Sequence, residues 1–153
     1  MRKQIINQAS PATHTGLDLE QLAQIEITSE DEAFPIESAL TANKVEGWKA
    51  AQPGEQVIRI MFDTPQKIQR VHLLFREEEK ERSQEFLLRW KPESDASYRE
   101  IVRQQYNFSP PQTTEESEEY TVNLDAVSAL ELTINPDING RGAYASLAQL
   151  QLI

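Results

Sequence analysis

Apolar and polar residues alternate along the middle of the chain, which is the pattern of half-buried β-strands. Two such runs, residues 57–62 and 68–75, flank the polar segment 63–67, which contains Pro65. The residues that share one face are Ile58, Ile60 and Phe62 in the first run and Val71, Leu73 and Phe75 in the second. This pattern predicts a β-hairpin with residues 63–67 as its turn. Because a lone hairpin leaves its apolar face uncovered, other strands must form a second layer.

The same alternation predicts further short strands. Their apolar residues are Ile25 and Ile27; Phe86, Leu88 and Trp90; Ile101 and Val102, which alternate less cleanly; Tyr120, Val122 and Leu124; Leu130, Leu132 and Ile134; and Ala148, Leu150 and Leu152. Single helical turns are expected over residues 17–22, capped by Asp18, and after Pro35. Residues 76–83 and 107–119 are polar and are predicted as loops. Eight short strands with little helix predict an antiparallel β-sandwich, most plausibly a jelly roll.

Length and composition indicate one domain. The chain has 153 residues, of which 39% are hydrophobic, and this is enough for one core. Residues 1–15 lack periodicity and are interpreted as a flexible tail, so the predicted domain spans residues 16–153. The chain contains no cysteine, which excludes a disulfide framework, a thiolate nucleophile and a zinc–thiolate site.

Charge and hydropathy restrict the environment and the partners. The formal net charge is −10, which opposes attraction to nucleic acid or anionic membrane, so neither is expected as a partner. No apolar run resembles a signal peptide or a membrane span. We therefore expect a cytoplasmic protein.

Connection lengths predict where a ligand would bind. The odd-numbered connections between the predicted strands have about 9 to 27 residues, whereas the even-numbered ones have about 4 to 6. In an antiparallel sandwich successive connections lie at alternate ends, so all the long loops should share one end. Binding residues concentrate on loops that a rigid scaffold holds in place, and this end is therefore the predicted ligand-binding surface. The first loop would bring Asn43, Trp48 and Lys49 to it.

Several short segments resemble those of a known family. They are Ser38-Ala39-Leu40, Gly47-Trp48, Phe62-Asp63, residues 68–71, 85–90 and 97–101, 129–132 and 147–150. In their order and spacing, over about residues 22–153, the chain resembles the discoidin, or coagulation factor 5/8 type C, group of galactose-binding-like domains. It is also similar to bacterial proteins of this pattern.

The resemblance implies a non-catalytic binding module whose ligands include sugars, membrane lipids and proteins. Many members of the group carry a structural calcium ion in the first long loop. Here residues 39–43 lack the carboxylate of the family's Ala-x-Asp-Gly segment, and Gln149 stands where a glutamate is often found. Calcium prefers several anionic oxygen ligands, so the sequence leaves a structural calcium ion as an open alternative and predicts no other metal or cofactor.

Seven residues of the long loops are candidates for binding a ligand: Trp48, Arg76, Arg82, Asn107, Asp137, Arg141 and Tyr144. Trp48 has the ring to stack on a sugar, but a tryptophan that closes the core is the stronger alternative. Each arginine has the geometry to bind hydroxyls or a carboxylate, with an ordinary surface role as the alternative. The acidic run 115–119 is interpreted as a solvated loop.

No catalytic motif is present. The sequence has no phosphate-binding glycine loop, nucleophile elbow or metal-binding histidine pair, and only an acidic pair meeting across loops would support a glycosidase. The sequence therefore predicts a non-enzymatic module for a carbohydrate or small polar ligand. The alternative is a protein-interaction or homo-oligomerisation domain that uses a patch including the outward Leu74 and Leu87.

Overall fold

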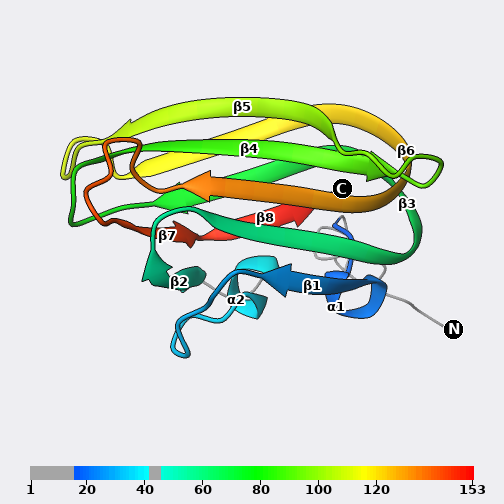
Figure 1. Ribbon diagram of the computed structural model, residues 1–153, viewed down its shortest axis with the longest axis horizontal. Coiled ribbons are helices and arrows are strands. Elements are labelled where there is room, and N and C mark those ends of the chain that lie inside the picture. Colours follow the sequence, from blue (N-terminus) through cyan, green and yellow to red (C-terminus); the bar gives the residue numbers. More distant parts are fainter. Residues whose placement is uncertain (1–15, 42–45) are drawn as a thin grey trace, which may run out of the picture.

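The computed structural model describes residues 16–41 and 46–153. This part of the chain contains eight strands and two one-turn helices, and every pair of neighbouring strands is antiparallel (Figure 1). In chain order the elements are α1 (Leu19–Leu22), β1 (Ala23–Ile27), α2 (Glu37–Leu40), β2 (Trp48–Pro53), β3 (Gln56–Arg76), β4 (Arg82–Pro92), β5 (Arg99–Phe108), β6 (Glu115–Asn135), β7 (Tyr144–Leu147) and β8 (Gln149–Leu152). The predicted antiparallel β-sandwich is confirmed.

Two long strands, β3 and β6, connect the two layers of the sandwich. Each has 21 residues and bends at the right-hand end of the molecule in Figure 1 before it returns to the left. The first half of β3 and the second half of β6 lie in one layer, in the order β1-β3-β6-β4-β5. The second half of β3 pairs with β8 and with the first half of β6 in the other layer.

The prediction of a hairpin over residues 57–75 is wrong. Both halves of the segment pair with β6, in a register that runs from Gln56 opposite Ile134 to Arg76 opposite Glu115. Residues 63–67 form a bend within β3, where the register with β6 shifts. Pro65 has no partner residue on β6, so its missing N–H group costs the sheet no hydrogen bond. Alternation identified the inward faces correctly, but it carries no information on which strand is the partner.

The prediction that residues 107–119 form a loop is also wrong at both ends. Strand β5 continues to the buried Phe108, and β6 already begins at Glu115. The outward carboxylates of β6 pair with arginines of β3: Arg76 Nε lies 3.3 Å from Glu115, and Arg70 Nη1 lies 3.1 Å from Glu119. Cross-strand ion pairs thus allow a strongly acidic segment to form a strand.

Both predicted helical turns are present. Asp18 stands at the N-cap of α1, although its side chain makes no capping hydrogen bond. Neither helix in the described residues has the length and apolar composition to cross a membrane. The predicted tail, residues 1–15, lies outside the described part of the chain.

The core lies between the layers and extends beneath the β2–β7 pair. It contains the predicted inward residues of β3 together with aromatic side chains, of which Phe75 and Phe86 stack with ring centroids 5.3 Å apart. Gly47 precedes β2 with φ of 73°, and a Cβ there would lie 2.6 Å from the carbonyl oxygen of Leu147. Only glycine therefore allows β2 to approach β7 this closely.

Candidate functional site

Three of the four connections that the sequence predicted to be long, residues 77–81, 109–114 and 136–143, meet at the left-hand end of the molecule in Figure 1, opposite the β4–β5 turn. Backbone hydrogen bonds join them: Glu77 N donates to Thr114 O at 2.8 Å, and Ile138 N donates to Ser83 O at 2.8 Å. The first long connection reaches the same region through Gly54, whose N–H donates to Ala143 O at 3.1 Å. These connections form one continuous surface.

A groove of about 410 Å³ lies on this surface, between the β3–β4 loop and strand β7. Its residues combine two aromatic rings with charges of both signs. They are Phe34, Glu46, Lys49, Arg76, Glu77, Glu78, Glu79, Lys80, Ala143, Tyr144, Ala145 and Ser146. Sugar-binding sites need an aromatic face for the ring and polar groups for the hydroxyls, and the groove offers both.

The aromatic part of the groove is supplied by Tyr144 and Phe34. Tyr144 begins β7 and is 51% exposed, although large hydrophobic and aromatic side chains elsewhere in the described chain are mostly covered. The Nζ atom of Lys49 lies 4.3 Å from the centroid of the Phe34 ring, a cation–π contact that fixes the ammonium group beside the groove.

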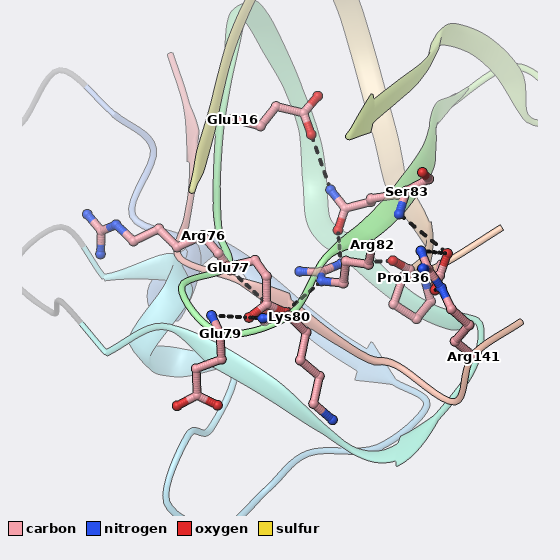
Figure 2. A network of polar contacts seen from close by, with 12 residues as sticks. Arg76, Glu77, Glu79, Lys80, Arg82, Ser83, Glu116, Pro136 and Arg141 are labelled. Atoms are coloured by element: carbon pink, nitrogen blue, oxygen red, sulfur yellow. Dashed lines mark hydrogen bonds and ion pairs between the residues drawn. The ribbon is translucent and has the colours of Figure 1, made fainter. Parts of the chain in front are cut away.

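Glu77 shapes the β3–β4 loop that forms the opposite wall (Figure 2). Its Oε2 accepts hydrogen bonds from the N–H groups of Glu79 and Lys80, at 3.1 and 3.3 Å. Its Oε1 accepts a hydrogen bond from Arg82 Nε at 2.8 Å. Burial opposes ionisation of this carboxyl, but these hydrogen bonds outweigh it and hold the pKa of Glu77 below its ordinary value. The loop therefore turns around one anchored carboxylate.

Arg82 is the anchor, and it is buried rather than exposed. It is 1% exposed, lies over the Phe108 ring with its guanidinium carbon 4.7 Å from the centroid, and donates from Nη1 to Gln84 Oε1 and Pro136 O, both at 3.0 Å. Its Nη2 has no hydrogen-bond partner among the described residues. The expectation that Arg82 contacts a ligand directly is thus wrong, because the side chain is used behind the groove to position the loops.

The hydrogen bonds continue from Arg82 through Gln84 to the buried carboxyl group of Glu116. Gln84 Nε2 donates to Glu116 Oε1 at 3.2 Å (Figure 2). Burial, together with the neighbouring Glu118, raises the pKa of Glu116 to about 8. Glu116 is therefore protonated at neutral pH, although the sequence suggested a solvated residue.

Asp137 and Arg141 form a second anchor, in the β6–β7 loop. Arg141 Nε donates to Asp137 Oδ2 at 2.5 Å, and Arg141 Nη2 donates to Oδ1 at 3.3 Å. Asp137 also accepts hydrogen bonds from the backbone of Ser83 and Asn139. The Arg141 guanidinium and these amides lower the pKa of Asp137 to about 2. Asp137 is buried, and its carboxylate accepts hydrogen bonds from residues of its own loop. The Arg141 side chain is half exposed and lies outside the groove.

The other predicted residues divide between core, groove and surface. Trp48 has no exposed area and donates from Nε1 to Ser29 O at 3.1 Å, so the structure supports the alternative that it closes the core. Arg76 and Tyr144 line the groove, and Arg76 also pairs with Glu115. Asn107 is exposed near the end of β5 and is not part of the groove. Asn43 lies outside the described residues.

Sequence reasoning missed Phe34 and Glu46, and it gave no role to Glu77. Phe34 precedes Pro35 in a segment expected to be a helical turn, and nothing in its spacing marks it as a groove residue. Glu77 lies in a run of like residues, of which only its carboxylate accepts a hydrogen bond from Arg82. A contact between residues five positions apart in a loop carries no periodic signal.

The calcium prediction is not decided by the described residues. Within 16–41 and 46–153, no three aspartate, glutamate or histidine side chains gather where they could hold a metal ion. Residues 42–45, which include part of the segment expected to bind calcium in relatives, lie outside the described chain.

Comparison with known proteins identifies the architecture. No protein-family model and no curated protein sequence matches the chain. Solved structures do match: the family 32 carbohydrate-binding module of NanJ from Clostridium perfringens, in complex with galactose, shares 14% identity over 90% of this chain and 97% of that chain, with a TM-score of 0.67. The chain has the galactose-binding-like fold.

Two further structures extend this likeness. The third such module, CBM32-3, of a family 31 glycoside hydrolase from Clostridium perfringens shares 16% identity over 98% of both chains, with a TM-score of 0.63. Reduced XRCC1, solved bound to the catalytic domain of DNA polymerase β, shares 10% identity over 86% of this chain and 95% of that chain, with a TM-score of 0.60. At these identities the likeness establishes the fold, and the predicted resemblance to discoidin domains is confirmed at that level.

Proposed function

We propose that this galactose-binding-like sandwich is a non-catalytic carbohydrate-binding module whose ligand occupies the groove between the β3–β4 loop and β7. The observation that carries the proposal is the exposed Tyr144 ring at the edge of a groove lined by fixed charges. A sugar ring stacks on tyrosine through its C–H face while its hydroxyls accept and donate hydrogen bonds at the rim.

The fold neighbours support this proposal. NanJ's module was solved with galactose, and others were solved with 4,5-unsaturated mannuronic acid and with GalNAc-β-1,3-galactose. Their variety of sugars indicates that the sandwich is a scaffold and that the loops select the ligand.

A glycan array followed by calorimetric titration tests the proposal. We expect at least one glycan to bind, and Tyr144→Ala to weaken it by about tenfold or more, since aromatic stacking contributes on the order of 1 kcal/mol beyond the apolar area it buries. Tyr98→Ala is the matched control, because Tyr98 lies at the opposite end, where the guanidinium carbon of Arg89 is 5.0 Å from its ring centroid. Binding that is lost equally in both variants, or no binding across a broad array, would contradict the proposal.

A protein partner is the second candidate, and the XRCC1 complex favours it because that chain of the same fold was solved bound to another protein. The patch predicted for it is weak: Leu74 and Leu87 are only partly exposed. Light scattering provides the test, since a homo-oligomer would have at least twice the mass of the 17.5 kDa chain. A monomer that also binds glycans through Tyr144 would exclude self-association as the function.

A further inference from the structure

The β3–β4 loop, which forms one wall of the groove, is connected to the buried Glu116 by a chain of side chains (Figure 2). Glu77 shapes the loop and accepts a hydrogen bond from Arg82. Arg82 Nη1 donates to Gln84 Oε1 at 3.0 Å, and Gln84 Nε2 donates to Glu116 Oε1 at 3.2 Å. Glu116 is therefore three hydrogen bonds away from the carboxylate around which the loop turns.

The backbone connects the same two places a second time. Glu77 N donates to Thr114 O at 2.8 Å, and Thr114 lies two residues before Glu116. Residues 115–124 of β6 pair with β3 on one side, and no strand of the described chain pairs with them on the other. The beginning of β6 therefore lies at a sheet edge, which can move outward without breaking a second ladder of hydrogen bonds.

The surroundings of Glu116 suit a neutral carboxyl group. Its Oε2 is buried and has no hydrogen-bond partner among the described residues, and β3 places the apolar Phe75 opposite it. Titratable side chains interact with Glu116, its hydrogen-bonded partners or its chain neighbours from every adjacent element: Glu118 and Tyr120 of β6, Arg76 of β3, Arg82 of β4, Tyr106 of β5 and Glu77 of the β3–β4 loop. Both arginines already bond to other carboxylates, Glu115 and Glu77.

We propose that the proton on Glu116 holds the β3–β4 wall of the groove in place, and that its loss releases this wall and weakens glycan binding. The inference rests on the proposed function and adds its regulation by pH. An ionised Glu116 has no donor for its Oε2 and is repelled by Glu118, and it becomes hydrated when the edge of β6 moves outward. This movement withdraws Thr114 O from Glu77 N and Glu116 from Gln84, so both connections to the loop are lost.

The pKa of Glu116, about 8, determines where the change occurs. At pH 9 about one molecule in eleven retains the proton, whereas at pH 6 nearly all molecules do. The apparent affinity falls with the fraction of molecules that can bind, so we expect a glycan to bind about tenfold more weakly at pH 9 than at pH 6. By linkage, saturation with glycan should raise the pKa of Glu116.

An NMR titration of the ligand-free protein tests the response of the loop. The N–H groups of Glu79 and Lys80 bond to Glu77 and report on its position. We expect their signals to titrate together with the carboxyl carbon of Glu116, with a common midpoint near pH 8, and to stay constant in Glu116→Gln. If the two amides do not follow the ionisation of Glu116, the loop does not sense this proton and the inference is wrong.

A glycan array probed at pH 6 and at pH 9 tests the effect on binding, and calorimetric titration of its strongest hit gives the magnitude. The wild type should lose about tenfold in affinity between these values, and Glu116→Gln less than about twofold. Glu119→Gln is the matched control: it removes an exposed carboxylate from the same strand, where Glu119 pairs with Arg70 outside the groove. This control should lose affinity as the wild type does. An equal loss in Glu116→Gln would show that another group causes the pH dependence.

The outcomes separate this inference from the proposed function. If glycans bind through Tyr144 with equal affinity at both pH values, the regulation is wrong while the glycan-binding function stands. If the loop amides follow Glu116 but no glycan binds at either pH, the proposed function falls, and the proton-dependent loop stands without it.

Discussion

The protein buries two charged side chains whose hydrogen-bond partners come from different kinds of structure. One is Arg82, at the loop end, and the other is Glu131, on the outer face of the sheet. Arg82 bonds to Glu77, Gln84 and Pro136, which belong to two loops and a strand. Glu131 lies 3% exposed between Arg59 and Arg89, its direct neighbours on β3 and β4. Arg59 Nε donates at 2.8 Å and Arg89 Nε at 2.9 Å.

The two side chains differ in the segments that their hydrogen bonds connect. The row Glu26, Arg59, Glu131 and Arg89 alternates in sign across four adjacent strands and follows from strand register alone. Burial opposes ionisation of Glu131, but hydrogen bonds from the two arginines outweigh it and lower its pKa. Arg82 instead joins segments that have no register, so it determines the shape of the groove. Similar chemistry thus stabilises a sheet in one place and holds the loops beside the groove in the other.

Removing Arg82 should have the largest effect. Arg82→Ala leaves Glu77, Gln84 and Pro136 O without their donor inside the protein, and we expect the free energy of unfolding to fall by about 3–5 kcal/mol in urea denaturation. Glycan binding should also weaken, because Glu77 loses its anchor. Arg89→Ala is the control: its partner Glu131 keeps Arg59, so the loss should be about 1 kcal/mol. Equal losses would contradict the distinction between the two charges.

Neutralising Glu131 should have a smaller effect that is confined to stability. In Glu131→Gln the arginines face an amide oxygen, and both are exposed enough to be hydrated instead. We expect a loss of about 1–2 kcal/mol by the same measurement. Glycan affinity should match that of the wild type, and a change in affinity would show that the outer face and the groove are coupled.

The buried Glu116 predicts a pH dependence. Its pKa is about 8 in the folded protein against 4.5 ordinarily, so between these values the folded state retains a proton that the unfolded state has lost. Stability due to this group should therefore fall as pH rises from about 4.5 to 8 and level off above. Glu116→Gln should remove this slope, so that the free energy of unfolding of the variant exceeds that of the wild type more at pH 9 than at pH 5. Parallel slopes in the two proteins would show that Glu116 is ionised when folded.

Tyr144 should have the smallest effect on stability. Because half of its side chain is exposed, Tyr144→Ala should change the free energy of unfolding by less than about 0.5 kcal/mol. The same variant should lose glycan binding, which would separate a residue that contacts the ligand from one, such as Arg82, that positions the loops. A large destabilisation would mean that Tyr144 is part of the scaffold.

The structure gives the positions of the predicted site residues, and their binding of a ligand stays a prediction. Tyr144 and Arg76 were expected at the long-loop end and do line the groove. Trp48 and Arg82 were expected there for their chemistry but are buried, because local sequence does not show which side of a loop faces the core. Phe34 and Glu46 were missed because they enter the groove from segments distant in sequence.

The sequence by itself determined the inward faces of the strands and the sandwich class, because these follow from a period of two. The predicted contrast between long loops at one end and short turns at the other is wrong, because residues 63–67 and 125–128 lie within β3 and β6 and the connections 77–81 and 109–114 are no longer than the β4–β5 turn, 93–98. Only the tertiary structure decided that β3 and β6 are single bent strands, that Arg82 is an internal anchor and that Tyr144 lines the groove. These features depend on contacts between residues far apart in the chain. Such contacts form only when the layers pack, so no local pattern encodes them.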